Sequence, residues 1–117
     1  MLNRIAALMQ RLPAGTDAAL IQSDVNRRYF TGMLSSAGTV LCFRDCAYFI
    51  IDFRYIEKAR TVVKNCTVLE QHDLLEQVRH LLEEHQAKTV AVESMTMTLN
   101  QFSKLKKSLG SRFRLDY

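Results

Sequence analysis

The chain has three histidines, His72, His80 and His85, which are the side chains best suited to metal binding or proton transfer near neutral pH. A hydrolytic metal site needs several imidazoles or carboxylates that converge on one ion. His80 and His85 are five residues apart, and on one helix their side chains would point about 140° apart, so they cannot bind one ion together. We therefore interpret all three histidines as surface or helix-end residues.

Three cysteines, Cys42, Cys46 and Cys66, suggest two further kinds of chemistry, metal binding and nucleophilic attack by a thiol. Cys42 and Cys46 are four residues apart across a predicted hairpin and could lie near each other, but no matching second pair completes a zinc knuckle. The sequence indicates no positioned base beside any of these thiols. We favour buried or turn cysteines, and their individual roles stay open.

Two acidic residues, Asp52 and Glu93, each follow a predicted apolar strand. Carboxylates at two strand ends could meet at a sheet edge and hold a divalent metal ion, as in a nuclease. Asp52 is equally suited to cap a helix that begins near Arg54, and Glu93 to pair with a basic residue. We favour these structural roles and keep a metal-dependent nuclease as an alternative.

A loop of small residues could also interact with a ligand or a neighbouring subunit, because it can present backbone N–H groups and hydroxyl groups. Its members are Met33, Leu34, Ser35, Ser36, Ala37 and Gly38. Composition alone favours the simpler reading, a connection between a helix and a strand.

Apolar spacing and turn residues predict the elements that position these side chains. Strands are predicted over residues 18–21, 39–43, 47–51, 66–69, 89–92 and 113–115, and helices over residues 5–12, 24–31, 74–82 and 99–109, with a further helix that begins near Arg54. Gly32 would end the second helix with a positive φ, and Val25 and Tyr29 would share its inner face. The pairs Asp73/Glu76 and Thr98/Gln101 are typical of helix starts.

Strands and helices thus alternate around a central hairpin formed by residues 39–51. This order predicts an α/β fold in which helices flank a mixed β-sheet. In the last helix, Phe102, Leu105 and Leu109 would face the core before Gly110 ends the helix. Residues 44–46 would form the hairpin turn, with Cys46 where a glycine is usual.

Composition and charge indicate an ordinary globular protein, with 48% hydrophobic and 24% charged residues, and favour one domain over residues 1–117. The net charge of +4 permits an acidic partner. The late basic residues are Lys104, Lys106, Lys107, Arg112 and Arg114. Since no aromatic residues are interleaved with them, we interpret them as a solvated helix face and do not expect nucleic acid as a partner.

No apolar run approaches the ~20 residues that cross a bilayer, so we do not expect a membrane partner. The odd number of cysteines and the absence of a basic, apolar leader favour the cytoplasm over a secreted disulfide framework.

Two local patterns are specific in combination: Asn26-Arg27-Arg28-Tyr29-Phe30-Thr31-Gly32-Met33, with its small-residue sequel, and Asp52-Phe53-Arg54-Tyr55. They resemble the Asn-x-x-Tyr-x-Thr-Gly-Phe and Asp-Gly-Arg-Tyr patterns in the amino-terminal domain of the creatinase/prolidase family. The matching positions are Asn26, Tyr29, Thr31, Gly32, Asp52, Arg54, Tyr55 and, in a weaker third pattern, Glu93. Departures from the family patterns are Met33 for Phe, Ser35 for Gly, Cys46 for Gly and Phe53 for Gly.

The resemblance implies a ribonuclease-H-like α/β domain without nuclease activity, joined to a pita-bread-shaped catalytic domain. In that second domain two Asp, one His and two Glu bind a pair of divalent metal ions, often manganese. None of these five ligands has a counterpart in this chain, so we expect no cofactor in it and a catalytic domain outside it. In several relatives the amino-terminal domain mediates subunit contact, and the loop similar to residues 33–38 narrows the active-site entrance of a partner subunit.

The first hypothesis is therefore a non-catalytic domain of a cytoplasmic Xaa-Pro peptidase, which supports oligomerisation and restricts substrates to short peptides with proline second. Its partners would be the catalytic domain and further copies of the parent. The alternative is a stand-alone protein-binding domain of a catalytically inactive relative. The sequence leaves open whether the parent is an aminopeptidase, a dipeptidase or a creatinase-like hydrolase, its oligomeric state, and whether it extends beyond residue 117.

Overall fold

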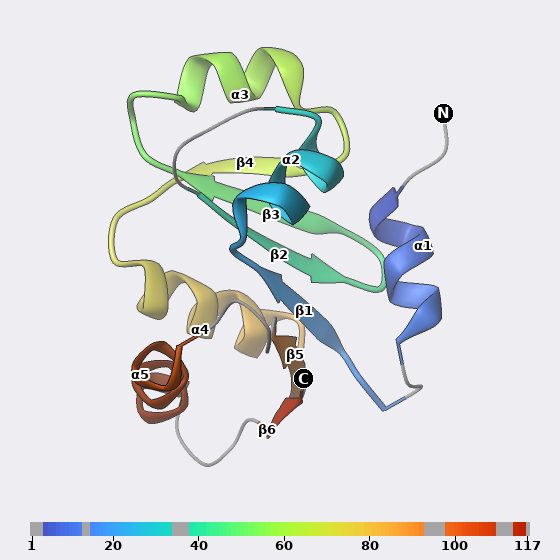
Figure 1. The fold of residues 1–117 in the computed structure, drawn as a ribbon, viewed down its shortest axis with the longest axis vertical. Coiled ribbons are helices and arrows are strands. Elements are labelled where there is room, and N and C mark those ends of the chain that lie inside the picture. Colours follow the sequence, from blue (N-terminus) through green and yellow to red (C-terminus); the bar gives the residue numbers. More distant parts are fainter. Residues whose placement is uncertain (1–3, 13–14, 34–37, 93–97, 110–113, 117) are drawn as a thin grey trace.

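A six-stranded sheet in the order β4-β3-β2-β1-β5-β6 forms the centre of the computed structural model (Figure 1). The structure describes residues 4–12, 15–33, 38–92, 98–109 and 114–116. The strands are β1 (Ala18–Ile21), β2 (Thr39–Phe43), β3 (Ala47–Ile51), β4 (Thr67–Glu70), β5 (Thr89–Val92) and β6 (Arg114–Asp116). The helices are α1 (Arg4–Arg11), α2 (Asp24–Thr31), α3 (Ile56–Val62), α4 (Leu74–Glu84) and α5 (Leu99–Leu109).

Both kinds of strand pairing occur in the sheet. Strand β2 pairs antiparallel with β1 and β3, and Thr39 lies opposite Ile50. Strands β4, β5 and β6 pair parallel with β3, β1 and β5 respectively. The predicted α/β class, a mixed sheet flanked by helices, is therefore confirmed.

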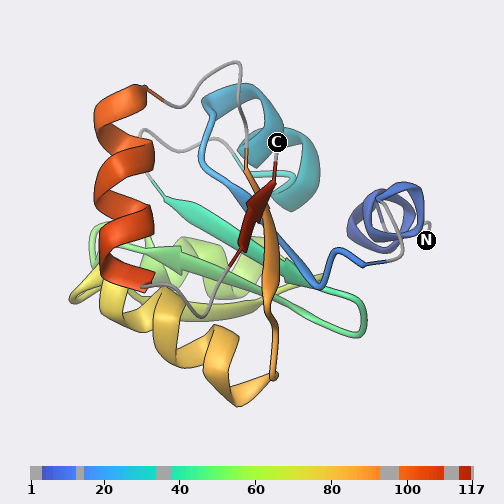
Figure 2. The ribbon, with the colours of Figure 1, turned by 90° about the horizontal axis from the view of Figure 1, so that it is seen from below.

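Helices cover both faces of the sheet, and the two views show α1, α2 and α3 on one side and α4 and α5 on the other (Figures 1 and 2). Each face has its own hydrophobic core: the first core lies under α1, α2 and α3, and the second lies under α4 and α5. Neighbouring strand residues point to opposite faces, so Phe49 packs in the first core and Ile50 in the second. Strands β2 and β3 are buried on both faces, which explains why their sequences are continuous apolar runs.

The hairpin turn between β2 and β3 is closed by the Phe43 amide, which donates to the Cys46 carbonyl over 2.7 Å. Among the described residues, Gln86 is the one non-glycine residue with positive φ, so Cys46 needs no left-handed backbone. Cys42 packs in the first core and Cys46 against the second. The structure therefore does not bring these two thiols together.

Capping residues and apolar spacing in the sequence predicted most helices and strands correctly. Asp73 accepts from the Glu76 amide at the start of α4, and the pair Thr98 and Gln101 forms a reciprocal cap on α5. Leu105 is buried as predicted, whereas the side chains of Phe102 and Leu109, and residue Gly110, lie outside the described part. Strand β4 begins at Thr67 rather than at residue 66, and β6 spans Arg114–Asp116 rather than residues 113–115.

Two sequence expectations were wrong. Tyr29 is 52% exposed, and the buried residues of α2 are Arg27, Phe30 and Thr31; the side chain of Val25 lies outside the described part. The Arg4 guanidinium stacks on the exposed tyrosine ring, with its central carbon 4.4 Å from the ring centre, while Arg27 occupies the inner face of the helix. Helix α3 begins at Ile56 rather than near Arg54, and its N-cap residue Tyr55 makes no side-chain capping bond.

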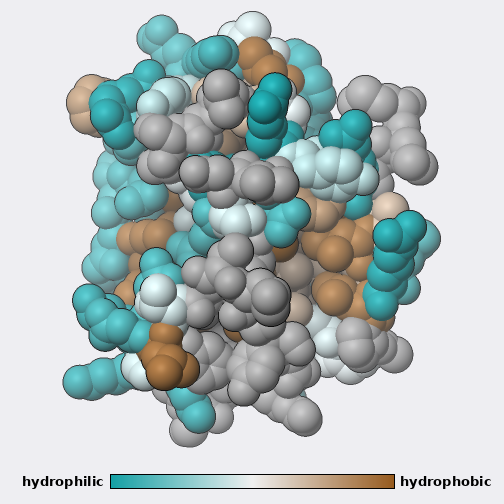
Figure 3. All heavy atoms as spheres, viewed as in Figure 1, coloured by the Kyte–Doolittle hydropathy of each residue, from teal (hydrophilic) through white to brown (hydrophobic). Residues whose placement is uncertain are grey.

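Hydrophobic side chains reach the molecular surface in separate places among hydrophilic ones (Figure 3). Large exposed hydrophobic residues in the described part are Tyr29, Phe53, Val62 and Leu99. Lys104, Lys106 and Lys107 are exposed on α5, as expected for a solvated helix face. Every described helix lacks the length or the apolar character that a membrane span requires.

Candidate functional site

Helix α2 carries the first family-like pattern, and both of its ends are capped. The Ser23 hydroxyl oxygen accepts from the Asn26 amide over 3.3 Å. Gly32 ends the helix with φ 74° and donates its N–H to the Arg28 carbonyl. A residue without Cβ adopts this conformation at little cost, so the sequence positions the end of α2 and the start of the following loop.

The buried Arg27 side chain ties together the segments that surround this loop. Arg27 is 2% exposed, and its Nη1 donates to the Gln22 carbonyl over 2.7 Å and to the Gly38 carbonyl over 3.3 Å. A guanidinium has fixed, forked donors and keeps its charge. Arg27 therefore joins the end of β1, helix α2 and the far end of the loop.

At the near end of the loop, Thr31 and Met33 are both buried. The Thr31 hydroxyl donates to the Arg27 carbonyl over 2.7 Å and accepts from the Met33 amide over 3.2 Å. This threonine thus links the last turn of the helix to the first loop residue, which explains its place in the pattern.

Gly38 fixes the far end of the loop by close approach. Its φ is 134°, and a Cβ built there would lie 2.8 Å from Cε1 of Phe49. A side chain at this position would be both strained and overlapping. The predicted loop is therefore anchored at Met33 and Gly38, while Leu34, Ser35, Ser36 and Ala37 lie outside the described part.

The second pattern forms a tight turn after β3. Asp52 accepts from the Arg54 amide over 3.1 Å and from Arg54 Nη2 over 2.8 Å, and the Arg54 guanidinium lowers the pKa of the Asp52 carboxyl. The Tyr55 amide closes the turn on the Asp52 carbonyl over 3.1 Å. Asp52 therefore organises the turn rather than capping α3, contrary to the capping role expected from the sequence.

The two patterns leave the sheet at the same end, because Thr39, which follows the loop, pairs with Ile50 just before the Asp52 turn. Strand β5 also ends there, since it runs parallel to β1, but Glu93 lies outside the described part. Asp52 does not belong to the one group of three or more possible metal ligands found among the described residues. The described part of these patterns is thus a scaffold for a loop.

That ligand group, Asp45, Cys46 and His85, lies at the opposite end of the sheet and was missed from the sequence. His72 and His80 are exposed as predicted, but His85 is half-buried. We compared histidines on one helix, and that comparison could not find a ligand set that combines the β2–β3 turn with the end of α4. The signal was topological: the hairpin turn and the connection that enters β5 must lie at the same end of the sheet.

The fold and this anchored loop define a class, an α/β domain that presents a loop between a capped helix and the central hairpin of a mixed sheet. The family model for the creatinase/prolidase N-terminal domain matches residues 1–115. The chain therefore belongs to the creatinase/prolidase family and corresponds to the N-terminal domain of that family.

Individual relatives agree with this assignment. The chain is 36% identical over 90 residues to an uncharacterized peptidase, YqhT, of Bacillus subtilis, and covers 26% of that protein. It is 36% identical over 84 residues to a putative Xaa-Pro aminopeptidase of Mycoplasma pneumoniae, and covers 24% of it. The chain thus spans about a quarter of the length of these relatives.

Solved structures show the same fold. A Streptococcus pyogenes Xaa-Pro aminopeptidase structure superposes with a TM-score of 0.87 at 27% identity, covering 97% of this chain and 87% of that one. A Corynebacterium diphtheriae N-terminal domain of a putative metallopeptidase gives 0.81 at 28% identity, covering 97% and 91%. The predicted family and fold are therefore confirmed.

Proposed function

We propose that this chain is the non-catalytic N-terminal domain of a metal-dependent Xaa-Pro peptidase of the cytoplasm, and that it supports oligomerisation and restricts access to the active site. The observation that carries the proposal is the match of residues 1–115 to the N-terminal domain of this family. Two relatives named as putative Xaa-Pro aminopeptidases are about four times as long as the matched region. One structural relative is named a cytoplasmic peptidase, PepQ of Mycobacterium tuberculosis.

The proposed restriction of access to the active site, which we call gating, rests on how the loop at residues 33–38 is anchored. Both ends are fixed, Met33 by the Thr31 hydroxyl and Gly38 by Arg27 and by close approach to Phe49. Loops carried by a rigid scaffold commonly supply binding contacts, and the fixed ends of this loop are what supports its proposed contact with another subunit. Restriction to short peptides with proline second follows if that position is the entrance of an active site.

The divalent metal pair, often manganese, belongs in this proposal to the catalytic domain. The described residues of this chain do not fit it: their one ligand cluster contains a thiol and consists of Asp45, Cys46 and His85. A paired manganese site of the family type needs five carboxylate and imidazole ligands, and manganese prefers such oxygen-rich sets. This chain therefore contributes no step of peptide hydrolysis in the proposal.

The first test is an assay of the purified chain with Xaa-Pro dipeptides and tripeptides in the presence of Mn²⁺. We expect no hydrolysis above the buffer rate. Hydrolysis that co-purifies with the chain through two different columns, and that is lost when the chain is removed with an antibody, would contradict the non-catalytic assignment.

The second test uses the longer protein encoded by the gene, if the reading frame continues into a catalytic domain. Replacing residues 34–37 by Gly-Gly should raise kcat/KM for peptides of five or more residues relative to Xaa-Pro dipeptides. The exposed α3 substitution Glu57→Gln is the matched control and should leave this ratio unchanged. An unchanged ratio in the loop variant would refute the restriction of access by this loop, and an unchanged mass in light scattering after deletion of the whole N-terminal domain would refute the oligomerisation role.

A further inference from the structure

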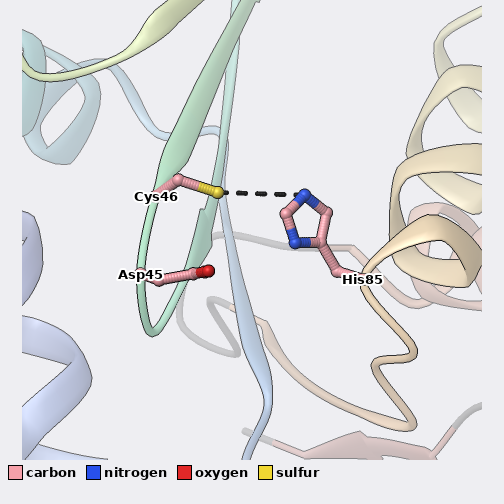
Figure 4. A group of neighbouring side chains, drawn as sticks. All are labelled: Asp45, Cys46 and His85. Carbon is pink, nitrogen blue, oxygen red and sulfur yellow. Dashed lines mark hydrogen bonds between the residues drawn. The ribbon is translucent and has the colours of Figure 1, made fainter.

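Asp45, Cys46 and His85 converge although they come from two elements far apart in the sequence (Figure 4). Asp45 and Cys46 belong to the turn between β2 and β3, and His85 ends helix α4. Cys46 Sγ lies 3.8 Å from His85 Nε2, across 39 residues of sequence. Their ligand atoms, with a carboxylate oxygen of Asp45, all lie within 4.8 Å of one another.

The imidazole of His85 is held in place from several sides. The His85 amide donates to the Leu81 carbonyl over 3.0 Å, which fixes its backbone at the end of α4. Its ring stacks on Phe43 with centroids 4.1 Å apart and an interplanar angle of 18°. The Tyr48 hydroxyl oxygen lies 2.9 Å from Nε2, so this nitrogen faces the hairpin.

We propose that Asp45, Cys46 and His85 bind one divalent ion of the zinc type, with a water molecule in the fourth position. Thiolate, imidazole and carboxylate together suit a borderline-soft ion such as zinc, whereas magnesium and calcium prefer oxygen ligands alone. This inference does not depend on the peptidase assignment, because it concerns the other end of the sheet.

The distances suit a tetrahedral ion. With Zn–S about 2.3 Å and Zn–N about 2.0 Å, the two ligand atoms lie about 3.5 Å apart at a tetrahedral angle. The observed separation of 3.8 Å between Cys46 Sγ and His85 Nε2 is close to that value. Asp45 is exposed in the turn, so its side chain can rotate to complete the site without moving the sheet.

Binding would replace two existing features of the site. Burial, and next the negative charge of Asp45, raise the pKa of the Cys46 thiol, so the ion must displace a proton that the thiol otherwise keeps. The Tyr48 hydroxyl would lose Nε2 as a partner and could donate instead to the bound water or thiolate. Hydrogen bonds from outside the ligand set orient the ligands of metal sites.

Two other features favour the site. The adjacent Arg44 guanidinium reaches away to the carbonyls of Met9 and Thr16, so its charge is directed toward α1. Cys42 is buried in the opposite core, and Cys66 packs against that core while it also lines the same cavity as Asp45 and Cys46. Cys46 is the thiol that belongs to the ligand cluster, and the nearby Cys66, which does not, supplies a matched control.

The test is titration of the purified 117-residue chain with Co²⁺, followed by competition with Zn²⁺. We expect thiolate-to-cobalt absorption in the near ultraviolet and the strong visible bands of a tetrahedral ion, both lost on adding one equivalent of Zn²⁺. Zn²⁺ should also raise the melting temperature, because an ion that binds only the folded chain stabilises it.

Cys46→Ser and His85→Ala should each weaken Zn²⁺ binding at least 10-fold and abolish the thiolate absorption, while Cys66→Ser should stay within 2-fold of the wild type. Circular dichroism checks that each variant is folded. If His85→Ala does not fold, Cys46→Ser and the wild-type spectrum decide alone. Absence of thiolate absorption in the wild type, or its persistence in Cys46→Ser, would overturn the site.

Discussion

Gly38 is the residue whose replacement should affect the loop anchor most directly. Gly38→Ala places a methyl group 2.8 Å from the Phe49 ring at a φ of 134°, so we expect a loss of about 1–3 kcal/mol in the free energy of unfolding. Urea denaturation followed by circular dichroism measures this loss.

Gly15→Ala is the matched control for this substitution. A Cβ at Gly15 meets nothing within 4 Å, so we expect a change within about 0.5 kcal/mol. Equal effects at the two glycines would show that close packing at Gly38 does not fix the loop.

A second prediction at the residue scale concerns the thiols of the first core. Burial raises the pKa of Cys42 to about 12, with the neighbouring Cys66 as the lesser cause, and burial raises that of Cys66 to about 12. Unfolded thiols lose their protons near pH 9 while the folded ones keep them. Stability from these groups is therefore complete below pH 9 and falls as the pH rises from about 9 towards 12.

Urea denaturation of the reduced protein at pH 7, 9 and 10 tests this pH dependence. The variant Cys42→Ala/Cys66→Ala should start less stable but lose less stability between pH 9 and 10 than the wild type. Parallel losses in both proteins would assign the alkaline instability to lysine or tyrosine residues instead.

At the scale of single elements, α5 depends on its reciprocal cap. The Gln101 amide donates to the Thr98 hydroxyl oxygen over 3.1 Å, and the Thr98 amide donates to the Gln101 side-chain carbonyl over 2.9 Å. Thr98→Ala should cost about 1 kcal/mol of unfolding free energy, measured by thermal and urea denaturation. Ser103→Ala, an exposed mid-helix change, should cost less than half as much, and a larger loss there would contradict capping as the cause.

Elements set by local signals could be predicted from the sequence, and those set by distant contacts could not. Strand β1 and the cap of α4 follow from adjacent residues, and both were located correctly. The inner face of α2 depends on Arg27, which is buried because the Gln22 and Gly38 carbonyls satisfy its charge. A buried arginine contradicts the usual apolar pattern, so periodicity selected Tyr29 instead.

The candidate sites divide in the same way. The anchored loop was recognised because its residues form a continuous pattern, from Asn26 to Gly38. The Cys46–His85 contact spans 39 residues, and single-sequence spacing carries no information over that distance. Predicting it requires the strand order first.

At the scale of the whole molecule, the two cores share one sheet and should unfold together. Leu82 is fully buried in the core under α4, and Cys42 is fully buried on the opposite face. Leu82→Ala should cost about 2–5 kcal/mol, and it should lower the urea midpoint for thiol labelling of Cys42 as much as the midpoint from circular dichroism.

Leu99→Ala is the control, because Leu99 is 87% exposed and should shift neither midpoint. Cys46→Ser/Cys66→Ser serves as the background, so that Cys42 is the single thiol labelled. Loss of circular dichroism signal while Cys42 stays protected would show that the two faces unfold independently.

The central place of β1 affects how the chain folds during synthesis. Strand β1 pairs with β2 on one edge and with β5 on the other, and β5 begins only at Thr89. A ribosome that has released residues up to β4 therefore exposes the β1 edge as an unpaired row of amides and carbonyls, which favours pairing with other chains. The nascent chain is most prone to aggregate in the interval before Thr89–Val92 emerges and closes that edge.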